Sequence, residues 1–366
     1  HDLAAFDAGA LSCDVIFLDL MMPGMDGVEA LRALAAAGTR ARIVLASGLE
    51  QRIIDSARRV AAMQGLDVAA VLRKPFRPAD IRSAIASALS RPVPRAVAAA
   101  AGGGSAVTLD DIDRAIDRHE FRVVFQPQLR LSDGAWTGVE SLARWEHPER
   151  GLLMPSAFVA LAEGTDRALP FTYEIVARSL EALARIEHEA GFRGALSVNV
   201  PPAALTDPGF PDHVLMLLAE GGVPGDRLVV EITETSIPSD PALCLDIETR
   251  LRMRGIRLSI DDFGTGHSSL ERLHDAPFDE MKIDMVLVRN ADRDPDLRTI
   301  VESAVALGRS LSMTTVAEGV ETAETQRWLA GIGCDFAQGF FIGRPMDPAS
   351  LVAWARARVP SAGAAA

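Results

Sequence analysis

The amino-acid sequence predicts two α/β domains, a small open parallel sheet followed by a (β/α)8 barrel. The segment PVPRAVAAAAGGGS at 92–105 cannot form a packed core and indicates a linker. On both sides of it, short apolar runs that end in polar residues alternate with helical patterns. A length of 366 residues also suits about two domains. We therefore predict a first domain at 1–90, a linker at 91–107, a barrel at 108–358 and a tail at 359–366.

Three apolar runs in the first domain end next to a polar residue that could take part in binding a ligand. The run at 15–18 ends at Asp19, the run at 42–46 ends at Ser47, and the run at 68–72 is followed by Lys74 and Pro75. Open parallel sheets place their ligands at the carboxyl ends of the strands. We therefore expect the carboxylate, the hydroxyl and the amine to lie close together.

These residues resemble the response-regulator receiver domain, which has a flavodoxin-like fold. The resemblance implies that Asp19 is the phospho-acceptor, that Ser47 is the switch hydroxyl, that Lys74 pairs with the phosphoryl group, and that Pro75 follows a cis peptide bond. It also implies a cognate histidine kinase as a possible partner and a role of this domain in modulating the second one.

The first domain departs from the receiver pattern at its beginning. The first strand and the two acidic residues that hold Mg²⁺ are missing, and without that strand the apolar edge of the run at 15–18 would be bare. Either residues are missing upstream, which we favour, or the domain is degraded or completed by a partner. Without a metal, phosphoryl transfer to Asp19 meets uncompensated repulsion, so we expect poor phosphorylation. Rapid Mg²⁺-dependent labelling by a small phosphodonor would contradict this expectation.

The second domain is predicted to be a barrel because eight strand-like runs recur from residue 121 onward, separated by helical patterns. Helices are expected at 109–119, 171–190, 211–220, 241–254 and 297–311. Repeated strand–helix units close into a barrel whose strand ends form one mouth. The polar residues that end the runs are Gln126, Glu140, Asn199, Glu231, Asp261 with Asp262, Lys282 with Asp284, Glu318 and Gln338.

Five carboxylates at these strand ends, those of Glu140, Glu231, Asp261, Asp262 and Glu318, indicate a metal site. Carboxylates held about 4 Å apart repel by several kcal/mol, so such a cluster needs protons or metal ions. Oxygen ligands without thiolate or imidazole favour Mg²⁺, Mn²⁺ or Ca²⁺ over zinc. The adjacent Asp261 and Asp262 suit two metals about 4 Å apart, an arrangement that supports in-line phosphodiester displacement.

The second domain resembles the EAL-domain cyclic-di-GMP phosphodiesterases, which have a TIM-like barrel. The resemblance covers about residues 108–358 and lies in motifs that occur in family order: FQPQ, ESL in place of EAL, SVNV, EITET, DDFGTGHSSL, KID, AEGVE and QGFFIGRP. It implies hydrolysis of cyclic di-GMP to linear pGpG with two Mg²⁺ or Mn²⁺ ions per active site. Ca²⁺ is expected to inhibit, because its coordination is longer and looser.

The resemblance also implies a role for each motif residue. Glu318 would act as a base near the attacking water, Lys282 would orient that water, and Glu234 would brace the loop at 263–270 that leads to the dimer contact. The first metal would be held by Glu140, Asn199, Glu231 and Asp261, and the second by Asp261, Asp262 and Glu318. The dinucleotide pocket would be lined by Gln126, Leu142, Arg144, Asp284, Glu321, Gln338 and Pro345.

Three positions depart mildly from the family. Ser141 replaces the alanine of the name and is expected to point away from the metals, because adjacent strand residues face opposite sides. His267 and Phe340 stand where tyrosine is usual. We expect these two changes to affect loop packing and regulation more than the chemistry.

Composition narrows the range of partners. A formal charge of −13 argues against a DNA-binding or anionic-membrane-binding protein. No apolar run reaches the length of about 18 residues that a bilayer span requires, so we expect a cytoplasmic protein without membrane contact. Cyclic di-GMP is the expected ligand, and a homodimer or higher oligomer the expected assembly. The alternative is a catalytically weak module that senses cyclic di-GMP or docks a protein, although the acids of the metal site are all retained.

Overall fold

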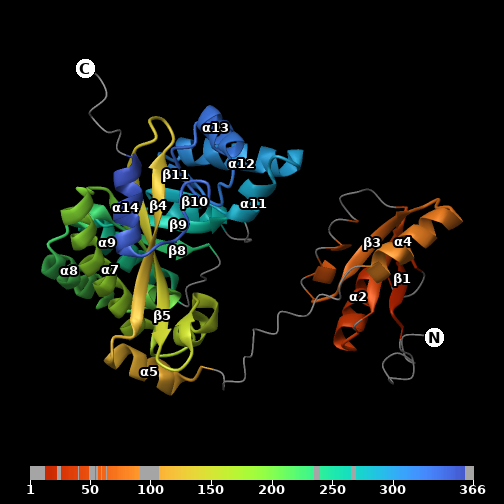
Figure 1. The fold of residues 1–366 in the computed structure, drawn as a ribbon, viewed down its shortest axis with the longest axis horizontal. Coiled ribbons are helices and arrows are strands. Elements are labelled where there is room, and N and C mark those ends of the chain that lie inside the picture. Colours follow the sequence, from red (N-terminus) through yellow and green to blue (C-terminus); the bar gives the residue numbers. More distant parts are fainter. Residues whose placement is uncertain are drawn as a thin grey trace. The chain divides into compact units, whose positions relative to one another are not determined.

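The computed structural model describes residues 13–22, 26–39, 41–48, 64–90, 107–234, 240–264 and 269–358, with parts of 54–62. The chain forms two compact units, His1–Gly104 and Ser105–Ala366 (Figure 1). Most of the predicted linker and the whole predicted tail lie outside the described residues, so these domain bounds stay predictions.

The amino-terminal unit contains a parallel sheet with the strand order β1-β2-β3. Leu31 on a neighbouring helix packs with Ile43 and Leu45 on one face, and Val44 packs with Leu72 and Ala84 on the other. In the described part of the chain β1 pairs only with β2, and Phe17 is 42% exposed. The elements are β1 (Val15–Asp19), α2 (Gly27–Ala36), β2 (Arg42–Ser47), β3 (Val68–Arg73) and α4 (Pro78–Ser90).

The carboxyl-terminal unit contains a closed barrel of eight strands, which confirms the predicted fold class. The ring runs β4-β12-β11-β10-β9-β8-β7-β5 and closes where β4 pairs with β5, while β6 extends β5. The strands are β4 (Phe121–Arg130), β5 (Trp136–His147), β6 (Gly151–Leu153), β7 (Ala195–Asn199), β8 (Leu228–Thr233), β9 (Arg257–Phe263), β10 (Glu280–Ile283), β11 (Thr314–Ala317) and β12 (Phe336–Gln338).

One strand of the ring runs against the others, which the sequence analysis did not predict. β4 is antiparallel to both β5 and β12. Five residues separate β4 from β5, too few for the crossover of a dozen or more residues that a parallel pair needs. Asp133 and Gly134 close this hairpin, with the Asp133 side chain accepting from the Ala135 amide at 3.0 Å. We had expected Gln126 and Glu140 to end their strands. The structure shows instead that both lie within long strands, β4 and β5.

Helices surround the strands of the barrel (Figure 1), and the four helices predicted between the strands agree with the structure within a few residues. Prolines begin α9, α12 and α14, where the missing amide hydrogen costs nothing. The helices are α5 (Leu109–Asp117), α6 (Val159–Glu163), α7 (Ala168–Ala190), α8 (Phe210–Gly221), α9 (Pro241–Met253), α10 (Ser269–Asp275), α11 (Met285–Asn290), α12 (Pro295–Ser310), α13 (Ala323–Ile332) and α14 (Pro348–Arg358), with short 3₁₀ turns at Pro155–Ala157, Pro202–Thr206 and Gly225–Arg227.

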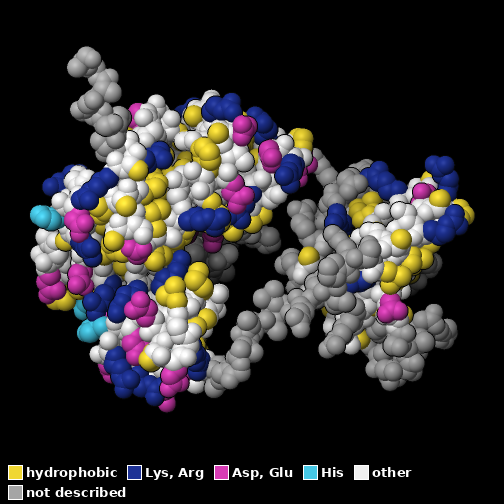
Figure 2. Space-filling model, viewed as in Figure 1, with side chains coloured by type: hydrophobic (Ala, Val, Ile, Leu, Met, Phe, Trp, Pro, Cys, Tyr) yellow, Lys and Arg dark blue, Asp and Glu magenta, His cyan; other side chains and the backbone are white. Residues whose placement is uncertain are grey.

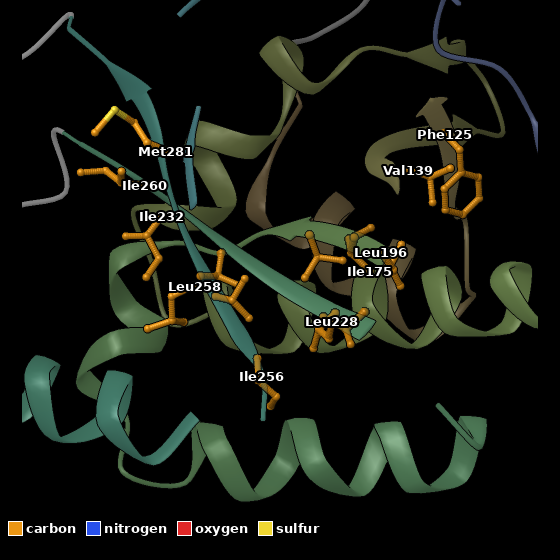
Figure 3. Close-up of a cluster of buried hydrophobic side chains, with 14 of the residues drawn as sticks. Phe125, Val139, Ile175, Leu196, Leu228, Ile232, Ile256, Leu258, Ile260 and Met281 are labelled. Carbon is orange, nitrogen blue, oxygen red and sulfur yellow. The ribbon is translucent and has the colours of Figure 1, made fainter. Parts of the chain in front are cut away.

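The hydrophobic core lies between the strands and the helices. Leu228, Leu258 and Met281 are fully buried there with their neighbours (Figure 3). Because strand residues alternate between faces, the residues next to them in sequence point into the barrel. Lys282 follows Met281 directly, and Glu231 follows the outward-facing Val230 on β8, so both point inward. Polar side chains therefore lie inside the barrel and apolar ones on its outer wall.

Charged side chains of both signs are interspersed over the visible face of the barrel unit (Figure 2). None of the described helices combines the length and apolarity that a bilayer crossing requires. The three cysteines are unpaired, with Cys244 and Cys334 buried.

Candidate active site

The centre of the site is one buried lysine among carboxylates from four other strands. The Nζ atom of Lys282 lies 2.8 Å from Glu318 Oε1, 2.9 Å from Glu231 Oε2, 3.1 Å from Asp261 Oδ1 and 3.6 Å from Glu140 Oε2. The lysine side chain is 1% exposed. The structure thus brings together five residues that the sequence predicted for one mouth.

A single ammonium group does not neutralise four carboxylates, three of them buried and that of Glu318 half-buried, and the pKa values of the cluster reflect this. Burial raises the pKa of Glu318 to about 8, with Asp261 and Glu140 adding to the effect and Lys282 opposing it. Burial raises the pKa of Glu231 well above its ordinary value for the same reasons. Although burial opposes it, the surrounding carboxylates raise the pKa of Lys282 well above its ordinary value. The cluster therefore favours the uptake of positive charge.

The geometry of the cluster fits hard divalent cations. Asp261, Asp262 and Glu318 each offer an oxygen, and these atoms lie within 4.8 Å of one another. Glu231 Oε1 is buried and has no hydrogen-bond partner among the described residues. Asp262 has a left-handed backbone with φ of 57°, a strained conformation for this residue type that is often found at functional sites. Burial and then Asp261 raise the pKa of Asp262 to about 6.

A chain of amide side chains orients Glu140. Asn199 Nδ2 donates to Glu140 Oε1 at 2.9 Å, and Gln338 Nε2 donates to Glu140 Oε2. Gln338 Nε2 also donates to Gln126 Oε1 at 3.0 Å, and its own Oε1 accepts from Gln128 Nε2 at 2.9 Å. These contacts and the charge of Lys282 outweigh the effect of burial and lower the pKa of Glu140.

Gln128 is a member of this network that the sequence analysis left unassigned. It is the last residue of the FQPQ motif, two positions after Gln126 on the same face of β4. Strand periodicity could therefore have identified it.

Ser141 points away from the carboxylates, as expected from strand alternation. Its hydroxyl lies 2.6 Å from the Ser179 hydroxyl on α7, on the outer side of β5.

We expect Ser141→Ala, which restores the EAL tripeptide, to leave cyclic-di-GMP turnover unchanged. The substitution removes one buried hydrogen bond, so the free energy of unfolding should fall by about 0.5–1.5 kcal/mol. Urea unfolding and a turnover assay on the same preparation check both statements. A large loss of turnover without unfolding would show that Ser141 contributes to the chemistry.

The residues predicted for the dinucleotide pocket have different local contacts in the structure. Leu142 and Arg144 follow Glu140 on the same face of β5. Arg144 is 8% exposed and forms no ion pair in the part of the chain that the structure describes, and burial lowers the pKa of its guanidinium. A buried, unpaired guanidinium suits a phosphate oxygen.

The remaining pocket residues lie on loops after the strands. Asp284 accepts from the Val286 amide at 2.7 Å and begins α11. Glu321 pairs with Arg289 at 2.9 Å. Pro345 precedes Met346. The backbone of Met346 exchanges two hydrogen bonds with that of Phe125, the residue before Gln126.

Glu234 contacts the start of the predicted coupling loop. Its Oε2 accepts from the Gly264 amide at 2.9 Å, and its own amide donates to the Asp261 carbonyl at 2.9 Å.

Residues 265–268, including His267, lie outside the described residues. Phe340 is 43% exposed, with the Arg344 guanidinium 4.2 Å from its ring centroid.

In the amino-terminal unit, the predicted phosphate-contacting residues also converge. The Lys74 ammonium contacts the Asp19 carboxylate, which lowers the pKa of Asp19. Ser47 is buried at the end of β2, and the Lys74–Pro75 peptide bond is cis, as the resemblance implied.

The carboxyl-terminal unit is therefore a closed α/β barrel with one reversed strand and a mouth of acids, amides and a buried lysine. The sequence matches the EAL domain family over residues 109–345 and the response regulator receiver domain family over residues 4–86. The chain therefore belongs to the EAL domain family and carries an amino-terminal receiver domain.

Among similar proteins is the cyclic di-GMP phosphodiesterase RocR of Pseudomonas aeruginosa, 32% identical over 91% of this chain and 84% of RocR. The cyclic di-GMP phosphodiesterase PA2567 of the same species is 32% identical over 68% of this chain, but this match spans only 42% of that protein. The structure of the PaMucR phosphodiesterase in complex with c-di-GMP is 35% identical, covering 66% of this chain and 98% of that one, with a TM-score of 0.62.

Proposed function

We propose that this protein is a phosphodiesterase that hydrolyses cyclic di-GMP to linear pGpG. The observation that carries the proposal is the cluster of the buried Lys282 with four carboxylates in the mouth of an EAL barrel. Similarity to RocR over nearly the whole chain supports the same substrate.

The mouth residues suit two Mg²⁺ or Mn²⁺ ions. Glu140, Asn199, Glu231 and Asp261 would hold the first ion, and Asp261, Asp262 and Glu318 the second. When bound, the ions supply Lewis acidity at the phosphodiester and promote deprotonation of the attacking water. Glu318 accepts the proton of that water, and Lys282 donates a hydrogen bond that orients it.

The surrounding residues would hold the dinucleotide. Arg144 binds a phosphate oxygen, whereas Gln126 and Gln338 keep Glu140 in place and present amide groups to the ligand. Leu142, Asp284, Glu321 and Pro345 complete the pocket.

The test is incubation of the purified chain with cyclic di-GMP and Mg²⁺ or Mn²⁺, followed by chromatography of the nucleotides. Linear pGpG is the expected product. Unchanged nucleotide that binds tightly would instead identify a cyclic-di-GMP sensor, and neither binding nor turnover would favour a docking scaffold.

We expect Ca²⁺ to inhibit the Mg²⁺-supported reaction. Ca²⁺ takes six to eight oxygen ligands at about 2.3–2.6 Å, whereas Mg²⁺ requires near-octahedral geometry at about 2.0–2.1 Å. The carboxylates would bind Ca²⁺ without the geometry that the reaction needs. Titration of CaCl₂ into the turnover assay measures this effect, and full activity with Ca²⁺ alone would contradict it.

The receiver domain would modulate this activity through Asp19, Lys74 and Ser47 in response to a cognate histidine kinase. Glu234 would couple the metal site to the loop at 263–270 and so to a homodimer contact. A cytoplasmic location fits a second-messenger hydrolase. Activity measured before and after phosphodonor treatment, together with the oligomeric state in solution, tests these proposals.

A further inference from the structure

A cavity of about 310 Å³ lies at the end of the barrel opposite the carboxylate mouth. Its lining comes from the first residues of β7, β8, β9 and β10 and the last residues of β4. Four arginines and two acidic residues, Asp226 and Glu280, line it, so the lining is more basic than the protein as a whole, whose formal charge is −13. Apart from Gln128, which also donates to Gln338, none of the residues that line this cavity belongs to the proposed active site.

Three buried polar atoms in this cavity lack hydrogen-bond partners within the described part of the chain. They are Thr137 Oγ1, Arg257 Nε and Glu280 Oε1. Glu280 is only 4% exposed. Buried polar groups in folded proteins are almost always hydrogen-bonded, so three such atoms around one cavity point to a polar ligand.

The charges show which side chain is free to bind an anion. Arg130 is paired with Asp133 at 3.0 Å and Arg193 with Glu187 at 3.5 Å, and Arg227 contacts Glu187 and donates to the Gly194 carbonyl. Arg257, in contrast, forms no ion pair with any described residue. Burial raises the pKa of Glu280, although the charge of Arg257 partly counteracts this rise. The Glu280 carboxyl group is therefore protonated more readily than an exposed one and repels a bound anion less.

We propose that this cavity binds a small phosphate-bearing anion, held by Arg257 and Thr137 through its oxygens and by Glu280 through a hydroxyl. A phosphate group offers both the acceptors and the hydroxyl that the three atoms require. The volume is at the lower end of the range of about 300–1,000 Å³ for ligand pockets, which suits a phosphate with a small sugar rather than a cyclic dinucleotide.

Such a ligand would connect to the mouth through two strands. Arg257 and Asp261 lie on the same face of β9, and Glu280 and Lys282 lie on the same face of β10. An anion that fixes the beginnings of these strands would therefore also fix the residues at their ends.

The test is calorimetric titration of the full chain with inorganic phosphate and, separately, with ribose 5-phosphate. EDTA keeps the mouth free of divalent cations, so its carboxylates repel anions there, and chloride at equal ionic strength serves as the blank. We expect saturable binding that is weakened about tenfold or more in Arg257→Gln and in Thr137→Val. Arg185→Gln, on the outer surface of α7, is the matched control and should bind normally.

The two ligands distinguish the sources of the phosphate group. Equal affinities would identify phosphate itself as the ligand, and tighter binding of ribose 5-phosphate would identify a phosphorylated metabolite; both support the proposal. Thr137→Val removes only a hydroxyl, so it remains informative if Arg257→Gln fails to fold. No binding beyond the chloride blank, or unchanged binding in folded variants, would overturn the proposal.

Discussion

Glu318→Gln should reduce cyclic-di-GMP turnover by about 10²- to 10⁴-fold, the usual contribution of a positioned general base. The amide cannot accept the proton of the attacking water, and it is a weaker ligand for a divalent cation. The fold should be retained, because the amide resembles the protonated carboxyl group that burial already favours at this position. Steady-state turnover with saturating Mn²⁺, together with urea unfolding, measures both effects.

The matched control for this variant is Glu324→Gln on α13. The Glu324 side chain is 77% exposed and pairs only with Arg327 among the residues described, so the same chemical change should leave turnover unaffected. Nearly normal hydrolysis by Glu318→Gln would remove the proposed role of this residue as a base.

Lys282→Met should destabilise the metal-free barrel by about 3–5 kcal/mol, the usual cost of removing one partner from a buried ionic cluster. The remaining carboxylates would lose the cation that contacts all four of them. Mg²⁺ or Mn²⁺ should restore part of the lost stability, because the ions supply positive charge to the same oxygens. The barrel transition in urea, recorded with EDTA and then with each metal, measures this.

Amine labelling of the unaltered protein tests separately whether Lys282 is enclosed, because the sequence contains only two lysines, Lys74 and Lys282. The Lys74 side chain is 43% exposed and that of Lys282 is 1% exposed. An amine-reactive reagent should therefore modify Lys74 first and Lys282 only when the barrel opens. Arg185→Met on the surface of α7 is the stability control. Equal stability of Lys282→Met and the unaltered protein in EDTA would refute the ionic cluster as described.

The carboxylate mouth could be predicted from the sequence because strand periodicity and motif order both locate it. Asp261, Lys282 and Glu318 each follow an apolar run, and parallel strands bring such ends together. The direction of β4 could not be predicted in this way, because an apolar run has the same pattern whether the strand is parallel or antiparallel to its neighbours. The five-residue connection at 131–135 was the available signal, since it is too short for a crossover.

The cavity at the opposite end of the barrel was missed for a different reason. Arg257 and Glu280 begin their strands, and a charged residue at the start of a strand is usually solvated. Only the closed ring reveals that these side chains point inward and are covered. For Gln128, strand periodicity was available as a signal for its face of β4, but the sequence does not reveal its hydrogen bond to Gln338, which is 210 residues away.

The reversed direction of β4 also determines where the chain enters the barrel. Phe121, the first residue of β4, lies opposite Trp145, beyond Glu140 along β5. Helix α5, immediately before β4, therefore joins the barrel at the rim that holds the acids, and Trp145 Nε1 donates to Glu120 at 3.0 Å there. With eight parallel strands the entry point would be at the far end. Because of this reversal, α5 attaches to the barrel on the same side as the acidic residues and not at the far end of the strands.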